Sequence, residues 1–155
     1  MYQYIKDPAA ITAESFKQIE ALADLTHLDE KLHPLALRLI HSSGQLEILN
    51  NLKINGDVMA HGISALGKTA PVLCDVEMVK HGLSKKYLTS EPLCFLNRSG
   101  VASEAKRLGM TRSMCALSHW KAHLAGAIVV IGNAPTALFR YLELLQQGAA
   151  KPALI

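Results

Sequence analysis

The sequence lacks the features that mark exported or membrane-spanning proteins. No apolar stretch reaches the ~20 residues that a membrane-spanning helix needs. The start, MYQYIKDPAA, has no apolar core of the kind found in export signals. We therefore expect a cytoplasmic protein with no membrane partner.

Cysteine is scarce and histidine is scattered. Cys74, Cys94 and Cys115 are odd in number and do not have metal-ligand spacing, so we expect reduced, mostly buried thiols. His119 and His123 are four residues apart and could share a metal on one helix, but no glutamate intervenes and no third ligand is evident. We expect surface histidines, no metal site and no cofactor.

Charge of one sign is not concentrated anywhere. The 16 basic and 13 acidic residues give a net charge of +3, without a basic run. This balance is too weak to indicate a nucleic-acid partner, but it suits a small polyanionic ligand. The sequence also has no phosphate-binding loop, dinucleotide fingerprint or nucleophile elbow.

What the sequence has is a strong strand–turn–helix signal near its end. Ala127 to Ile131 is a continuous apolar run, typical of a strand buried on both faces of a parallel sheet. Gly132 to Pro135 breaks the run, and helical spacing follows from Thr136 to Gly148. Such turns lie at the carboxyl ends of strands, where α/β proteins bind ligands.

Strands and helices are expected to alternate through the rest of the chain. Half of the 155 residues are hydrophobic, which suits one globular domain over residues 1–155. We expect an α/β fold with helices on both faces of a parallel sheet of four to five strands. The expected strands are Val58–Ala60, Ala70–Cys74, Leu93–Leu96, a central Ala127–Ile131 and the start of a fifth at Pro152–Ile155.

Several helix ends are also predicted. Asp7 is expected to cap a helix that begins at Pro8, and Pro34 opens a second helix. Short helical stretches are expected around Ser64 to Gly67 and from Val76 to Val79. Further helices are expected over Val101–Leu108, closed by Gly109, and from a Thr111 cap to about Leu124.

His41 is the first candidate for chemistry. It follows Arg38 by three residues at an expected helix interruption, Ser42-Ser43-Gly44. A histidine titrates near neutral pH and can act as a general acid. From spacing alone, a histidine at the end of a helix is the commoner explanation.

Two further groups follow expected strands or open expected helices. Arg112 and Ser113 after Thr111 combine a cation, a hydroxyl and helix N–H groups, which suit a carboxylate, although an ordinary cap fits equally well. Asp75 follows a strand and either joins a ligand site or caps the next helix. Asn133 and Thr136 stand at the turn, as helix caps or ligand contacts.

The chain resembles the precorrin-8X methylmutase family of corrin biosynthesis, in its metal-free and cobalt-containing branches. The resemblance covers nearly the whole chain, and its motifs follow the family's order. They are Y-I-K-D-P-A-A-I…S-F near the start, R-L-I-H-S-S-G at Arg38 to Gly44, L-C-D-V-E-M-V-K-H-G at Leu73 to Gly82, T-R-S at Thr111 to Ser113, and A-I-V-V-I-G-N-A-P-T-A-L at Ala127 to Leu138.

The resemblance implies a flavodoxin-like three-layer α/β sandwich, with a mostly parallel sheet, that forms a homodimer. It implies an isomerase that moves a methyl group from C-11 to C-12 of precorrin-8X or its cobalt form, giving hydrogenobyrinate or cobyrinate. The catalytic histidine of the family falls on His41, and its ligand-binding pair on Arg112 and Ser113. The substrate is a corrinoid tetrapyrrole with carboxylate side chains, for which Arg38, Asp75, Asn133 and Thr136 are further candidate contacts.

One departure from the family leaves alternatives open. The family continues past P-A-L-I with a P-V-G-F-type stretch, whereas this sequence ends at Ile155, so we expect a C-terminal stretch to be missing. A member without it could bind or carry a tetrapyrrole without converting it. A flavodoxin-like signalling or mononucleotide-binding domain has weaker support, because Asp75 has no acidic neighbour of the kind a phosphoacceptor site needs.

Overall fold

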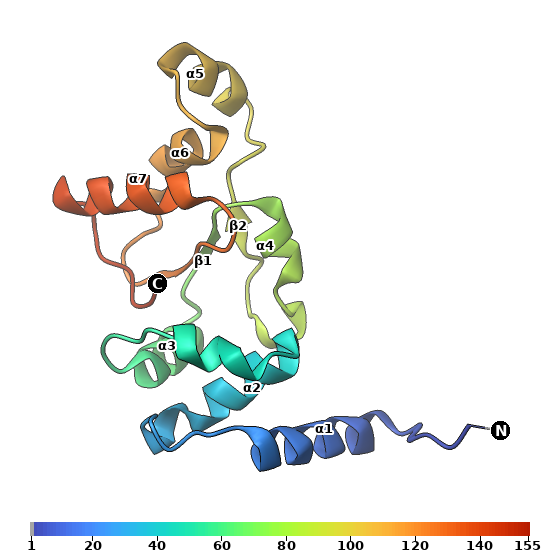
Figure 1. Cartoon of the computed structure of the whole chain (residues 1–155). Coiled ribbons are helices and arrows are strands. Elements are labelled where there is room, and N and C mark those ends of the chain that lie inside the picture. Colours follow the sequence, from blue (N-terminus) through green and yellow to red (C-terminus); the bar gives the residue numbers. More distant parts are fainter. Residues whose placement is uncertain (1) are drawn as a thin grey trace. The chain divides into compact units, whose positions relative to one another are not determined.

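The computed structural model describes residues 2–155, whose elements are shown in Figure 1. Contacts divide the chain into two compact units, one ending at Met59 and the other running from Ala60 to Ile155. Each unit has hydrophobic clusters of its own. The expectation of a single domain over the whole chain stays a prediction.

The first unit is helical. Its elements are α1 (Pro8–Leu22), η1 (Glu30–Leu32), α2 (His33–Ser43) and η2 (Leu46–Asn51). As predicted, Asp7 caps α1, because its carboxylate accepts a hydrogen bond from the backbone N–H of Ala10 at 2.8 Å. The core is formed by Ala36 and Ile40 of α2 with Leu49 of η2.

The second unit is built on a parallel sheet of three strands. They are β1 (Val72–Cys74), β2 (Leu93–Cys94) and β3 (Ile128–Val130), in the order β2-β1-β3. Beyond β3, Leu154 forms a single parallel bridge with Ile128. The prediction of an α/β fold with a parallel sheet is confirmed.

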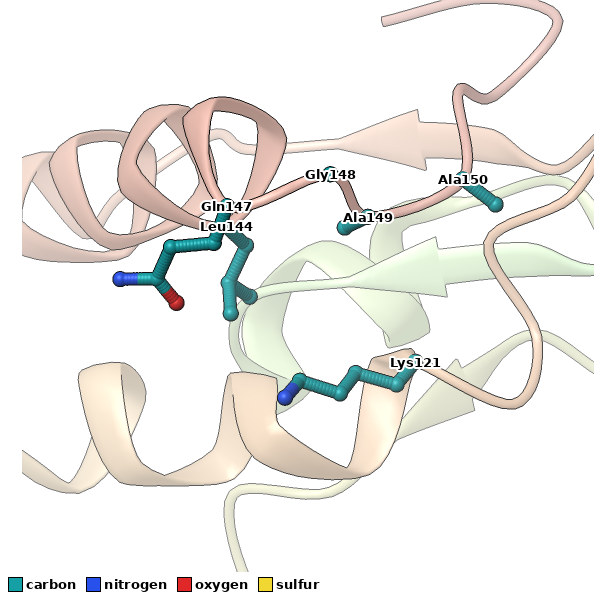
Figure 2. Close-up of a pocket in the computed structure, with 6 residues that line it drawn as sticks. All are labelled: Lys121, Leu144, Gln147, Gly148, Ala149 and Ala150. Carbon is teal, nitrogen blue, oxygen red and sulfur yellow. The ribbon is translucent and has the colours of Figure 1, made fainter.

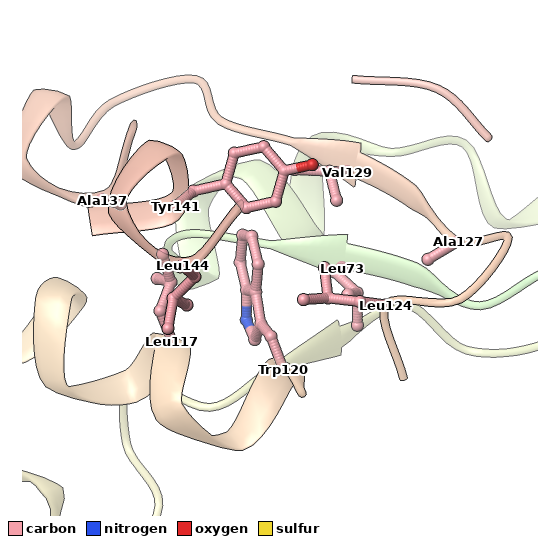
Figure 3. Packing of buried hydrophobic residues seen from close by; sticks show 9 residues of the cluster. All are labelled: Leu73, Leu117, Trp120, Leu124, Ala127, Val129, Ala137, Tyr141 and Leu144. Atoms are coloured by element: carbon pink, nitrogen blue, oxygen red, sulfur yellow. The ribbon is translucent and has the colours of Figure 1, made fainter. Parts of the chain in front are cut away.

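Apolar side chains cover both faces of this sheet. Leu73 and Val129 face a cluster that includes Trp120 and Tyr141, shown in Figure 3. Their neighbours along the strands, such as Cys74, face a second cluster. Side chains alternate between faces along a strand, so the apolar runs predicted from the sequence supply both layers.

Helices supply the rest of each cluster. The first face is covered by η4 (Leu117–Trp120) and α7 (Pro135–Gln146), and the second by residues of α3 (Val58–Gly67) and α4 (Glu77–Gly82). This gives the helix–sheet–helix layering expected of the fold. The unit also contains η3 (Lys85–Tyr87), α5 (Val101–Leu108) and α6 (Arg112–Ala116).

Some sequence predictions are wrong in detail. Val58 to Ala60 is the first turn of α3 and not a strand, so the described residues form three strands instead of four or five. β1, and not the Ala127 to Ile131 segment, is the central strand. Pro152 to Ile155 contributes one bridge, and the helix expected to reach Leu124 splits into α6 and η4.

Other local predictions are confirmed. α5 spans Val101–Leu108 and ends at Gly109, whose φ of 63° is a left-handed conformation that glycine tolerates. Thr111 caps α6 by accepting a hydrogen bond from the N–H of Met114 at 3.2 Å. Among residues 2–155, no helix combines the length and the apolar character needed to cross a membrane.

Candidate active site

The first group of candidate residues lies where α2 meets α1. His41 is in the last turn of α2, and its Nδ1 lies 2.9 Å from the Ser15 hydroxyl of α1. Its ring also stacks on Phe16, with centroids 4.8 Å apart and planes inclined by 13°. Two contacts from one neighbouring helix therefore fix the position and the tilt of the ring.

These contacts leave the other ring nitrogen open. Within residues 2–155, Nε2 of His41 has no hydrogen-bond partner, and the residue is exposed. A hydroxyl can both donate and accept, so Ser15 can pair with Nδ1 whether that nitrogen is protonated or not. His41 can thus hold a proton on Nε2 for a ligand and lose it without breaking the contact to Ser15.

The helix end does not depend on His41. Gly44, with a φ of 69°, donates its N–H to the carbonyl of Ile40 at 2.8 Å, and the Ser43 hydroxyl donates to the carbonyl of Leu39 at 2.8 Å. The last carbonyls of α2 therefore have partners other than the imidazole. This weighs against the alternative in which His41 merely closes the helix.

Arg38 belongs to the same group. Its guanidinium carbon lies 5.6 Å from the centroid of the Phe16 ring that also stacks on His41. Among residues 2–155, no carboxylate forms an ion pair with Arg38. The cation is therefore available beside an exposed imidazole, an arrangement suited to a ligand that carries carboxylates.

The second group lies at the carboxyl ends of β1 and β3. Asp75 directly follows β1 and is only 1% exposed. Its Oδ2 accepts the N–H groups of Ala134 at 2.7 Å and Asn133 at 3.1 Å, and its Oδ1 accepts that of Gly132 at 3.3 Å. One carboxylate thus holds the whole turn between β3 and α7.

This arrangement changes the role expected for Asp75. Both of its oxygens are engaged with the backbone and almost nothing of the residue is exposed, which favours holding the turn over direct substrate contact. It does not cap α4 either, because that helix begins after Val76 without a side-chain cap. Asp75 instead accepts hydrogen bonds from a turn that lies 57 to 59 residues further along the chain.

The turn is connected to the Arg112 group by two hydroxyls. Oγ1 of Thr136, in the first turn of α7, lies 3.0 Å from Oγ1 of Thr111, the cap of α6. Arg112 and Ser113 follow as the first residues of α6, and their N–H groups have no partner within that helix. The contact brings together residues that are 25 positions apart in the sequence.

Two details differ from the sequence prediction. α6 has only five residues, so its dipole is small, and the charge of Arg112 must supply most of the attraction for an anion. Neither Asn133 nor Thr136 caps α7, because Ala134 occupies the cap position without a side-chain bond. Asn133 is instead exposed and lines a hollow with Pro135 and Leu138.

A second pocket lies elsewhere and contains none of the expected site residues. It is formed at the far end of α7 by Leu144, Gln147 and the Gly148–Ala150 segment, with Lys121 opposite (Figure 2). The candidate residues Thr136 and Asn133 are at the other end of this helix. This pocket is therefore separate from both groups of candidate residues.

The arrangement of metal-binding side chains and the environment of the cysteines can be described directly. Among residues 2–155, no group of three His, Cys, Asp or Glu side chains is arranged to hold a metal ion. All three cysteines are free, and burial raises the pKa of each thiol, to about 11 for Cys74. Thiols with raised pKa values are poor nucleophiles at neutral pH.

Sequence reasoning missed the residues that support His41. Ser15 and Phe16 contact the imidazole across 26 and 25 positions respectively, a separation that no local pattern covers. The available signal was the S-F pair that ends the first quoted motif, since those two letters are Ser15 and Phe16. The contact between Thr111 and Thr136 had no comparable signal.

Comparison with known proteins agrees with the resemblance seen in the sequence. A family model described as precorrin-8X methylmutase matches residues 10–155. Precorrin-8X methylmutase of Pseudomonas aeruginosa is 45% identical over an alignment 157 positions long, which covers 100% of this chain and 76% of the relative. Cobalt-precorrin-8 methylmutase of Priestia megaterium is 34% identical, with 96% of this chain and 67% of the relative covered.

A solved structure gives the same result for the fold. The crystal structure of precorrin-8X methylmutase from Thermus thermophilus superposes with a TM-score of 0.83 at 30% identity, covering 94% of this chain and 72% of that one. The family model, the aligned relatives and the superposition each extend over most of the chain. The chain therefore belongs to the precorrin-8X methylmutase family.

Proposed function

We propose that this protein is an isomerase of corrin biosynthesis that moves a methyl group from C-11 to C-12 of precorrin-8X. The observation that carries the proposal is the 45% identity over the whole chain to a relative named precorrin-8X methylmutase. The exposed imidazole of His41, which contacts Ser15 and stacks on the same Phe16 ring that Arg38 contacts, supports the same reaction.

His41 acts as the general acid in this proposal. Its Nε2–H donates a proton to the conjugated macrocycle, which becomes electron-poor, and this lowers the barrier to migration of the methyl group. The bond from the methyl to C-11 breaks while the bond to C-12 forms. Because the product is an isomer of the substrate, the proton is released again and no co-reactant is consumed.

The arginines bind the carboxylates at the edge of the macrocycle. Arg112 with the Ser113 hydroxyl forms one anion-binding group, and Arg38 forms another. Asn133 is exposed beside the turn and is a candidate contact for a further polar side chain of the substrate. Arg38 precedes His41 by three residues on α2, so a carboxylate held by Arg38 limits the motion of the ring relative to the acid and lowers the entropic cost of reaction.

We further propose that the natural substrate is the metal-free form. The reported relative named for precorrin-8X is 45% identical to this chain, against 34% for the one named for the cobalt form. Parallel assays with both substrates test this choice.

The non-catalytic alternative receives no support. Both reported relatives carry the names of enzymes, and His41 has its second nitrogen open in a way that binding alone does not require. We also propose a homodimer, as the family resemblance implies, and a cytoplasmic location. Light scattering that gives a monomer at all accessible concentrations would contradict the dimer.

Single-turnover conversion tests the proposed function. Enzyme in excess over precorrin-8X should convert the bound macrocycle to a product of the same mass with the absorption of a corrin, without any added cofactor. Binding without conversion would support the carrier, and an absence of both would reject the whole proposal.

A further inference from the structure

We propose that Asp75 is a positioning residue that sets the placement of Arg112 and Ser113 from a distance. The proposal rests on the proposed function, in which those two residues bind a substrate carboxylate. The path runs from Asp75 to the 132–134 turn, then along α7 to Thr136, and across a hydroxyl contact to Thr111.

The first step is the bond between Asp75 and the turn. A carboxylate that is 1% exposed loses its hydration, and three backbone N–H groups replace the lost water. Charge-assisted bonds of this kind are short and directional, as the 2.7 Å contact to Ala134 shows. The backbone N–H of Asp75 also bonds to Val130 at 3.2 Å, so both strands end in a fixed relationship.

The second step is the tight fit of the turn against α4. A Cβ added to Gly132 would lie 2.7 Å from Cγ2 of Val79, closer than real Cβ atoms approach other atoms. Glycine is therefore required for the turn to lie this close to α4 while its N–H reaches Asp75. The turn is held from both sides, by the carboxylate and by the helix.

The third step connects the turn, through the start of α7, to α6. Ala134 ends the turn and is the cap residue of α7, so fixing its N–H fixes where α7 begins. Thr136 follows in the first turn of α7 and contacts Thr111 at 3.0 Å. Thr111 in turn caps α6 through its bond to Met114 and directly precedes Arg112.

An asparagine at position 75 cannot replace the carboxylate. Its amide has one acceptor oxygen and one NH₂ group, so one side would point a donor at backbone donors. The path therefore explains why an acid is buried at this position when it has no cation partner among residues 2–155.

The test uses Thr136→Val, because it removes the hydroxyl while keeping the shape of the side chain and leaves Asp75 in place. Thr136→Ser keeps the hydroxyl, and Asp75→Asn disrupts the hydrogen bonds between residue 75 and the 132–134 turn. Ser103→Ala is the control, since it removes a hydroxyl of α5 that donates to the carbonyl of Gly100, the residue before that helix. Dissociation constants for the reaction product, melting temperatures and amide resonances are measured for each.

We expect Thr136→Val to weaken product binding about five-fold to ten-fold, with a melting temperature close to that of the control, and Thr136→Ser to restore binding. In an Arg112→Ala background, Thr136→Val should have little further effect, because it acts through Arg112. Equal fold-changes in both backgrounds would show that Thr136 contacts the ligand itself, and would overturn the proposal.

Ligand-free spectra separate this proposal from the proposed function. Thr136→Val and Asp75→Asn should both shift the amide resonances of Arg112 and Ser113, and Asp75→Asn should also speed hydrogen exchange at Gly132 and Ala134. If the wild-type protein binds no corrinoid, the proposed function fails. The amide shifts still test whether Asp75 and Thr136 determine the placement of Arg112 and Ser113. Unchanged Arg112 and Ser113 resonances in folded Thr136→Val would overturn it.

Discussion

The hydroxyl of Ser15 and Nδ1 of His41 lie 2.9 Å apart, so a residue of α1 determines which imidazole nitrogen remains open. The Phe16 ring next to Ser15 stacks on the same imidazole and limits its rotation. A general acid is effective only when its proton points at the reacting atom. α1 therefore contributes to the proposed chemistry although none of its residues is fully buried.

Replacing His41 tests its proposed role most directly. His41→Ala should fold and still bind the macrocycle, because ring burial and carboxylate contacts are left in place. Turnover should fall by about two to four orders of magnitude, the usual effect of removing a positioned acid. His41→Asn keeps a hydrogen-bonding group without a useful proton, so it should be nearly as slow in a single-turnover assay.

The opposite outcome has a distinct signature. If His41 serves only the end of α2, both variants should lower the melting temperature and leave the rate per folded molecule nearly unchanged. Ser42→Ala is a matched control, since its hydroxyl bonds to the carbonyl of Leu39 in the same helix end. A full-rate His41→Ala enzyme would remove the histidine from the mechanism.

Arg112→Ala should weaken binding of the carboxylated macrocycle while leaving the fold intact. The loss of a charge-assisted hydrogen bond costs about 1.5–3 kcal/mol, which corresponds to about ten-fold or more in affinity. Arg107→Ala is the control, because Arg107 is an exposed arginine of α5 that pairs with Glu104 at 3.7 Å. Titration should show a weaker complex for the first variant alone, and equal dissociation constants would exclude Arg112 from the site.

The features that the sequence predicts correctly are those that depend on residues close together in the chain. α5 is bounded as expected because Gly109 supplies a left-handed residue directly after its last turn. The strand Val58–Ala60 is not found, since three apolar residues fit a helix as well as a strand and the longer α3 includes them. Local patterns also cannot show that Asp75 bonds to residues 57 to 59 positions away.

The same limit applies to the candidate site. The positions of His41, Arg112 and Ser113 follow from motifs, but the contacts that hold them do not. Ser15 reaches His41, and Thr136 reaches Thr111, only after the helices have packed. The candidate residues could thus be named from the sequence, whereas the residues that contact and support them required the structure.

Gly132→Ala should destabilise the second unit. The added methyl would meet Cγ2 of Val79 at 2.7 Å, and both the turn and α4 are held in place by other contacts. Overpacking of this kind costs about 1–3 kcal/mol in the free energy of unfolding. Denaturant unfolding measures the loss, and the double variant Gly132→Ala, Val79→Ala should recover part of it.

A control for this prediction is Gly67→Ala in α3. An added Cβ at Gly67 has no neighbour within 4 Å, and its φ is not positive, so the substitution should leave stability equal or slightly higher. If Gly132→Ala were as stable as Gly67→Ala, the turn would have to be more adaptable than its contacts with Asp75 and Val79 indicate.

Cys74 should make stability fall at alkaline pH. Burial raises the pKa of its thiol from 9.0 to about 11, because the folded protein disfavours the thiolate. The folded state therefore binds the proton more tightly than the unfolded state. This contribution to stability is complete below about pH 9 and is lost as the pH rises toward 11.

Cys74→Ala lacks the thiol, so its stability should decline less than that of the wild type across the same pH interval. The free energy of unfolding of both proteins is measured with denaturant at several pH values between 8 and 11. Lysines and tyrosines titrate alike in both proteins, so their contribution is removed when the two curves are subtracted.

At pH 8 the Cys74 thiol should also resist alkylation in the folded protein and react rapidly in denaturant, which peptide mass spectrometry can follow. Parallel stability curves for both proteins, or rapid alkylation of folded Cys74 at pH 8, would contradict this account of the buried thiol.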